Sequence, residues 1–215
     1  MDLTDSRAIS IESKGPSLEG LLHLPEQTPA PGIVVCHPHP TYGGEMHNNV
    51  VDAICETAVE KGIAALRFNF RGAGGSEGRY DNGIGERDDV RAALAYIRGL
   101  AEVDSARVAL AGYSFGANVA LQAADDRLSA FIAVSLPTTM PLGEVQIACP
   151  ALFVSGDQDE YSDAGELTRL VRGLGPQAEL KLLPGLGHFW FGVERDLQAI
   201  MAPFLRAHLI GVTAP

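Results

Sequence analysis

Residues 107–125 read RVALAGYSFGANVALQAAD, and they decide how the rest of the chain is interpreted. The apolar run Val108–Ala111 predicts a buried strand, and the run Ala117–Ala124 is rich in residues that favour a helix. Between the two runs lies the pentapeptide G-x-S-x-G, with Ser114 at its centre. A serine on a sharp turn between strand and helix is typical of a nucleophile elbow, whose strained backbone lifts the hydroxyl above the sheet. Gly112 and Gly116 lack a Cβ, so the strand and the helix can approach each other closely.

A second G-x-S-x-G pentapeptide has Ser76 at its centre, within residues 74–78. The residues after it, GRYDNG at 78–83, are typical of a loop and do not begin a helix. A nucleophile elbow needs a strand before the serine and a helix after it. We therefore expect Ser114, and not Ser76, to be the nucleophile.

The composition is that of an ordinary globular protein, with 46% hydrophobic and 20% charged residues in a chain of 215. This length predicts a single domain, residues 1–215, that can bury a substantial core. The net charge of -11 argues against nucleic acids and anionic membranes as partners. A small molecule is the partner that these properties favour, and we expect a monomer or a small homo-oligomer.

Features that would direct the chain out of the cytoplasm are missing from the sequence. Residues 1–10 do not have the basic-then-apolar layout of a signal peptide, and no apolar run approaches the roughly 20 residues that span a bilayer. The three cysteines, Cys36, Cys55 and Cys149, are far apart and form no C-x-x-C pair. We therefore expect reduced thiols and a cytoplasmic protein.

Short apolar segments alternate with amphipathic ones along the chain. Strands are expected at residues 8–13, 18–24, 32–36, 63–70, 108–111, 130–136, 151–155 and 179–183. Helices are expected at residues 48–61, 86–100, 117–124, 164–173 and 197–209. The alternation predicts an α/β protein with a mostly parallel sheet, helices on both faces and an antiparallel edge made by the first two strands. Ligands of such sheets bind at the carboxyl ends of the strands.

The connection between the strands that end at Leu136 and begin at Ala151 is short. It contains about a dozen residues, 137–149, and two prolines lie within it, which is in the usual range for a plain connection. A helical lid would need more residues than this. The sequence therefore predicts an open site without a cap domain.

A serine nucleophile needs a histidine base and a carboxylate that orients it, in the chain order Ser, acid, His. His188 follows a predicted strand in the loop PGLGH, whereas His208 lies in a terminal helical pattern, so His188 is the expected base. The loop after residue 155 offers Asp157, Asp159 and Glu160 as candidate acids. We favour Asp159, because Asp157 is nearest to the strand end and can cap the turn there.

An oxyanion hole needs two backbone N–H donors, of which one should belong to Phe115, the residue after the nucleophile. The other should come from the loop after Cys36, where the two prolines carry no N–H. His39, Thr41 and Tyr42 remain as donors, and His39 is favoured. Substrate-binding side chains are expected from Tyr42, Phe189 and Trp190, although aromatic residues under a histidine loop can also be plain core packing.

The sequence also contains residues that could suggest a metal site or a phosphate-binding loop. His37, His39 and His47, with Glu45 nearby, have the residue types of a metal site, but the same loop is needed for the oxyanion hole. Residues 71–75 are glycine-rich like a phosphate loop, but they lack the Gly-Lys-Ser/Thr ending. We expect neither a metal nor a cofactor.

Together these segments resemble the α/β-hydrolase superfamily, and most of all its small, cap-less bacterial serine hydrolases of the dienelactone-hydrolase-like kind. The matching segments are HPHP at 37–40 with GG at 43–44, RFNFRGAG at 67–74 with Ser76, GYSFG at 112–116, GDQD at 156–159 and GHF at 187–189. In this family the triad acid is the last residue of G-x-x-D, which is Asp159 here. Dienelactone hydrolases proper carry a cysteine nucleophile, whereas position 114 is serine.

These features predict a serine hydrolase that cleaves short-chain carboxylic esters through Ser114, His188 and Asp159. A thioesterase, an amidase or a peptidase would use the same residues. A ligand-binding relative without catalysis is the alternative from another class, and it would be expected to lack one of the three.

Overall fold

The computed structural model describes residues 6–143 and 145–211, and they form one sheet with helices on both faces. The sheet has eight strands in the order β1-β2-β4-β3-β5-β6-β7-β8. Their bounds are β1 Arg7–Glu12, β2 Ser17–His23, β3 Ala30–Cys36, β4 Ala64–Phe68, β5 Val103–Tyr113, β6 Ala130–Val134, β7 Ala151–Gly156 and β8 Ala178–Leu183. β1 pairs antiparallel with β2 and β2 with β4, while the pairings from β4 to β8 are parallel. The predicted mostly parallel sheet with an antiparallel edge is confirmed.

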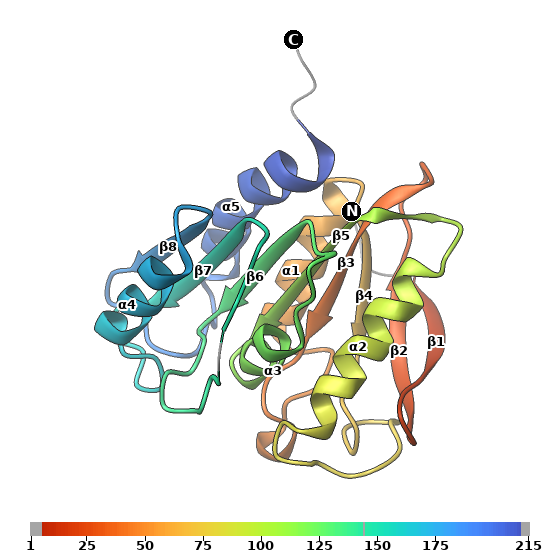
Figure 1. Cartoon of the computed structure of the whole chain (residues 1–215), viewed down its shortest axis with the longest axis horizontal. Helices are drawn as coiled ribbons and strands as arrows, with labels where there is room; N and C mark the ends of the chain where they lie inside the picture. Colours follow the sequence, from red (N-terminus) through yellow and green to blue (C-terminus); the bar gives the residue numbers. More distant parts are fainter. Residues whose placement is uncertain (1–5, 144, 212–215) are drawn as a thin grey trace.

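Five α-helices cover the sheet in two layers, and their bounds are α1 Asn49–Glu60, α2 Gly85–Arg98, α3 Phe115–Ala123, α4 Ala164–Leu174 and α5 Glu194–Leu205 among the described residues. One apolar core lies between the sheet and α2, α3 and α4, and a second lies between the sheet, α1 and α5. Figure 1 shows α2, α3 and α4 in front of the sheet, with α1 behind it. Strands β3, β4 and β6 are buried along their whole length because both faces are covered.

Two elements are longer than, or shifted from, the predicted ones. β5 begins at Val103 and not at Val108, because Val103 pairs with Ala30 before the register shifts between Ala30 and Gly32. The residues from 104 to 107 are polar except for Ala106, so this part of the strand carries no apolar run. α5 spans Glu194–Leu205 and continues as a wider turn, Arg206–Ile210, so the predicted helix at 197–209 begins too late.

The connection between β6 and β7 contains no helix in its described residues, 135–143 and 145–150. Its residues Leu136 and Ile147 are buried, and they belong to the core between the sheet and α2, α3 and α4. The predicted absence of a cap domain agrees with this connection. In the portion of the chain that the structure describes, no helix has the length and apolar character needed to cross a membrane.

Candidate active site

Ser114 lies at the junction of β5 and α3, with a left-handed φ of 55° and a ψ of -123°. A non-glycine residue at such an angle is strained, and it persists only because its surroundings hold it. The close approach of the two elements explains the flanking glycines. A Cβ on Gly112 would meet the backbone of Gly116, and a Cβ on Gly116 would meet the carbonyl oxygens of Cys36 and His37.

His188 lies between Ser114 and Asp159. Its Nε2 is 2.9 Å from Ser114 Oγ, and its Nδ1 is 2.9 Å from both carboxylate oxygens of Asp159. A carboxylate can only accept, so Nδ1 carries the hydrogen and Nε2 is free to accept the serine proton. Ser114 follows β5, Asp159 follows β7 and His188 follows β8, so the three predicted residues meet at the carboxyl ends of the strands.

Asp159 is the buried carboxylate of its loop, while Asp157 and Glu160 are exposed. Burial acts to raise the pKa of Asp159, but hydrogen bonds from His188, the Tyr161 N–H and the Ser135 hydroxyl outweigh it and lower the pKa below its usual range. An ionised acid beside Nδ1 is the result. Asp157 instead accepts a 2.7 Å hydrogen bond from the Gly185 N–H, which ties its loop to the histidine loop.

Trp190 does not line the site, so its predicted role in substrate binding is wrong. The side chain is fully buried in the core behind the site, and its Nε1–H donates to Ser135 Oγ at 3.1 Å. Phe189 and Phe191, on either side of it, point outward and line the cavity. The indole therefore anchors the histidine loop from inside. Residues 188–191 lie outside the strands and helices, so no periodic pattern in the sequence signals this orientation.

Two backbone N–H groups remain as candidate oxyanion donors. Within the described ranges, the N–H groups of Phe115 and His39 have no acceptor. The other predicted donors are engaged, because the Thr41 N–H donates to His39 Nδ1 and the Tyr42 N–H donates to the His39 carbonyl.

His37 orients the peptide bond that carries the His39 N–H. The sequence did not reveal this role and offered His37 only as a candidate metal ligand. Its Nδ1 donates to the Pro38 carbonyl oxygen at 2.6 Å, on the same peptide unit, while its Nε2 accepts from the Phe70 N–H at 2.9 Å. Burial lowers the pKa of His37 to about 4, so the ring is neutral at pH 7. Both ring nitrogens are used, which leaves none for a metal. No group of three His, Cys, Asp or Glu side chains in the described ranges is arranged as metal ligands would be.

Ser76 is a structural residue of the loop after β4. Its buried hydroxyl donates to the Asn69 carbonyl at 2.7 Å and accepts from the Glu19 N–H at 2.9 Å. The bond from Glu19 ties the glycine-rich segment to β2, and the bond to Asn69 ties it to the chain just after β4. No histidine ring nitrogen is among the described hydrogen-bond partners of this serine, so nothing there would activate it as a nucleophile.

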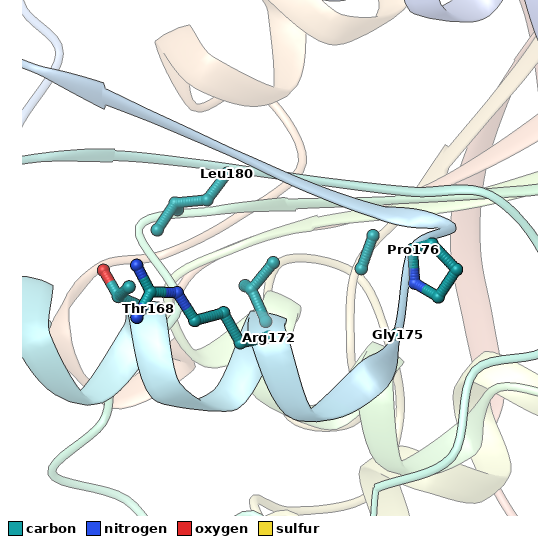
Figure 2. A pocket seen from close by; sticks show the side chains of 7 residues that line it. Thr168, Arg172, Gly175, Pro176 and Leu180 are labelled. Carbon is teal, nitrogen blue, oxygen red and sulfur yellow. The ribbon is translucent and has the colours of Figure 1, made fainter.

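A cavity of about 670 Å³ opens over Ser114 and His188. Its walls come from the loops after β3, β6, β7 and β8, and they include the predicted residues His39, Tyr42, Phe115 and Phe189. A second hollow lies between α4 and β8, and Figure 2 shows that Thr168, Arg172, Pro176 and Leu180 line it. That hollow lies at the edge strand of the sheet, and no histidine or carboxylate is among its described lining residues, so it offers no comparable chemistry.

The fold and the cavity at the carboxyl ends of its strands define an α/β-hydrolase without a lid. The chain belongs to the dienelactone hydrolase family, whose model matches residues 18–202. It is therefore a hydrolase of this family, and the predicted resemblance is confirmed.

Solved structures and a curated relative agree with this membership. An α/β serine hydrolase homologue from Coxiella burnetii has a TM-score of 0.84 and 33% identity, over 93% of this chain and 97% of that one. An α/β serine hydrolase without lid from Xanthomonas campestris has a TM-score of 0.87 and 33% identity, over 99% and 98%. A protein of Rickettsia prowazekii is 35% identical over 173 residues, which are 75% of this chain and 72% of the relative.

Proposed function

We propose that the protein is a serine carboxylesterase that hydrolyses short-chain esters of small molecules through Ser114, His188 and Asp159. The observation that carries this proposal is the continuous chain of 2.9 Å contacts from Asp159 through His188 to the Ser114 hydroxyl, at the floor of an open cavity. A nucleophile, a base and an orienting acid in hydrogen-bond contact are what acyl transfer requires.

In the acylation step, Ser114 Oγ attacks the ester carbonyl carbon while His188 Nε2 takes the hydroxyl proton. The N–H groups of Phe115 and His39 stabilise the oxyanion that forms. The tetrahedral intermediate collapses, the bond to the leaving alcohol breaks, and Nε2–H gives its proton to the alcohol oxygen. Asp159 stabilises the imidazolium and keeps Nδ1 protonated throughout.

Deacylation repeats the same steps with water as the nucleophile. His188 takes a proton from the water, the hydroxide attacks the acyl-enzyme, and Ser114 recovers its proton as the acid is released. Every proton is transferred through the one imidazole, so the reaction needs no group beyond the chain and water.

Labelling with a fluorophosphonate probe tests the nucleophile, and Ser76→Ala is the matched control. Ser114→Ala should lose all labelling and nearly all ester turnover, since the covalent step needs this hydroxyl. Ser76→Ala should keep the labelling, with a loss of stability of about 1–3 kcal/mol from the buried bonds that it breaks. Near-normal turnover in Ser114→Ala would exclude this mechanism. Parallel assays with an ester, a thioester and an anilide of one acyl group separate the esterase from the related acyl-transfer activities.

A further inference from the structure

The cavity over Ser114 has no formal charge on its walls. Among the described residues that line it, there is no Lys, Arg, Asp or Glu. Two carboxylates contact its wall, because Glu194 Oε1 accepts from Asn49 Nδ2 at 2.8 Å and Asp159 lies 2.9 Å from His188 Nδ1. The chain as a whole carries a net charge of -11. A carboxylate on the substrate would find no cation to pair with and would lose its hydration, so the site disfavours anionic substrates.

Two phenylalanines beside His188 are exposed to an unusual degree. Phe189 is 57% exposed and Phe191 is 75% exposed, and their rings lie nearly parallel, at 14°, with centroids 6.2 Å apart. Between them Trp190 is buried and hydrogen-bonded to Ser135, so the backbone that presents the two rings is held from inside. The pair is therefore an apolar platform whose orientation the core maintains, and its exposed faces gain free energy when an apolar group covers them.

This platform adjoins the base that must protonate the leaving group. His188 Nε2 has to reach the oxygen of the departing alcohol to protonate it. The ring of Phe189 stands at 88° to the imidazole of His188, with centroids 5.4 Å apart. Because Phe189 and Phe191 line the same cavity as His188, a group attached to the leaving oxygen can reach them.

We propose that the enzyme selects esters whose alcohol part is an uncharged aromatic group, such as a benzyl group, held against Phe189 and Phe191. The selection rests on the proposed esterase function and adds the chemical class of the leaving alcohol to it. Aromatic rings in offset or edge-to-face contact contribute more binding free energy than the area that they bury would give. The excess corresponds to about a fivefold preference over a saturated ring of the same size.

The test compares kcat/KM for benzyl acetate, cyclohexylmethyl acetate and 4-carboxybenzyl acetate. All three form the same acetyl-enzyme, so differences in kcat/KM report the alcohol part alone. We expect benzyl acetate to exceed cyclohexylmethyl acetate about fivefold, and 4-carboxybenzyl acetate to fall at least about tenfold below benzyl acetate. Phe189→Leu and Phe191→Leu should each bring the benzyl preference towards one, because each removes a ring that makes the aromatic contact.

Ile84→Ala is the control variant, because Ile84 is an exposed apolar residue outside the cavity, and it should retain the full preference. Equal kcat/KM for the benzyl and cyclohexylmethyl esters would overturn the aromatic selection, as would a preference that both leucine variants retain. Faster turnover of the carboxybenzyl ester would overturn the selection for uncharged groups. Failure of all three esters together with an unlabelled Ser114 would reject the esterase function itself, which is a distinguishable result.

Discussion

At the scale of single residues, two aspartates in one loop have different environments. Asp159 is buried and in contact with His188, while Asp157 is exposed and bonded to the Gly185 N–H. Asp159→Asn should lower kcat by about 10⁴-fold, because an amide in place of the carboxylate favours the wrong tautomer of His188. Asp157→Asn removes only charge from a loop contact and should change kcat less than about tenfold.

Steady-state kinetics of the two variants, with circular dichroism to confirm that each is folded, decide between these acids. The reverse ranking would assign the acid to Asp157. Equal and small effects would mean that His188 needs no ionised partner.

His37 makes stability depend on pH. Burial lowers its pKa from 6.5 to about 4, so between these values the unfolded chain binds a proton that the folded protein does not. The contribution of His37 to stability is therefore fully present at pH 7, falls as the pH drops below about 6.5, and is lost by about pH 4. Each pH unit between the two pKa values corresponds to about 1.4 kcal/mol, so the free energy of unfolding falls by about 3 kcal/mol over this pH range.

Denaturant unfolding at pH 7, 5.5 and 4.5 measures this loss. His37→Asn should shrink the pH dependence by about one proton, whereas His47→Gln, at an exposed position, should leave the dependence as it is. An unchanged slope in His37→Asn would show that this ring is protonated in the folded state.

At the scale of elements, the elbow between β5 and α3 depends on the absence of side chains. A Cβ at position 116 would meet the carbonyl oxygens of Cys36 and His37, which belong to the end of β3 and the start of its loop and cannot withdraw. Gly116→Ala should therefore destabilise the protein by about 3 kcal/mol or more. Gly173→Ala is the matched control, because Gly173 lies inside α4 with nothing within 4 Å of the added Cβ.

The control substitution should raise the free energy of unfolding by about 0.5–1 kcal/mol, since alanine favours a helix. Thermal unfolding of the two variants measures both effects. If Gly116→Ala had the stability of the parent protein, β3 and α3 would have to be farther apart than the structure places them.

At the scale of the whole molecule, the cavity has no cover in the described part of the chain. The β6–β7 connection holds no helix in residues 135–143 and 145–150, and with the loops after β3, β7 and β8 it forms part of the walls. Each CH₂ of an acyl chain contributes only about 0.8 kcal/mol, and only if it is buried. We therefore expect the highest kcat/KM for acyl groups of roughly two to six carbons, with no rate increase at an oil–water interface.

Measurements with p-nitrophenyl acetate, butyrate, octanoate and palmitate test this expectation. The common leaving group keeps its intrinsic reactivity constant, so the series reports the acyl side alone. A maximum at palmitate, or a jump in rate above the solubility limit of the substrate, would reveal a cover over the cavity.

The order of strands and helices, the elbow at Ser114 and the choice of His188 follow from the sequence alone, because they rest on local patterns. Apolar runs and glycine spacing are properties of neighbouring residues, and the order of nucleophile, acid and base along the chain can be read without knowing any contact. The absence of a cap is of the same kind, since too few residues separate two strands to form one.

Only the tertiary structure decided the positions that depend on distant partners. Trp190 points inward because Ser135, fifty-five positions away, accepts its Nε1–H. His37 is a positioning residue because the Phe70 N–H, in the loop after β4, fixes its tautomer. β5 extends back to Val103 because Ala30 pairs with it there. None of these partners is near in the sequence, and a single polar or aromatic residue carries no periodic signal, so folding alone brings each pair together.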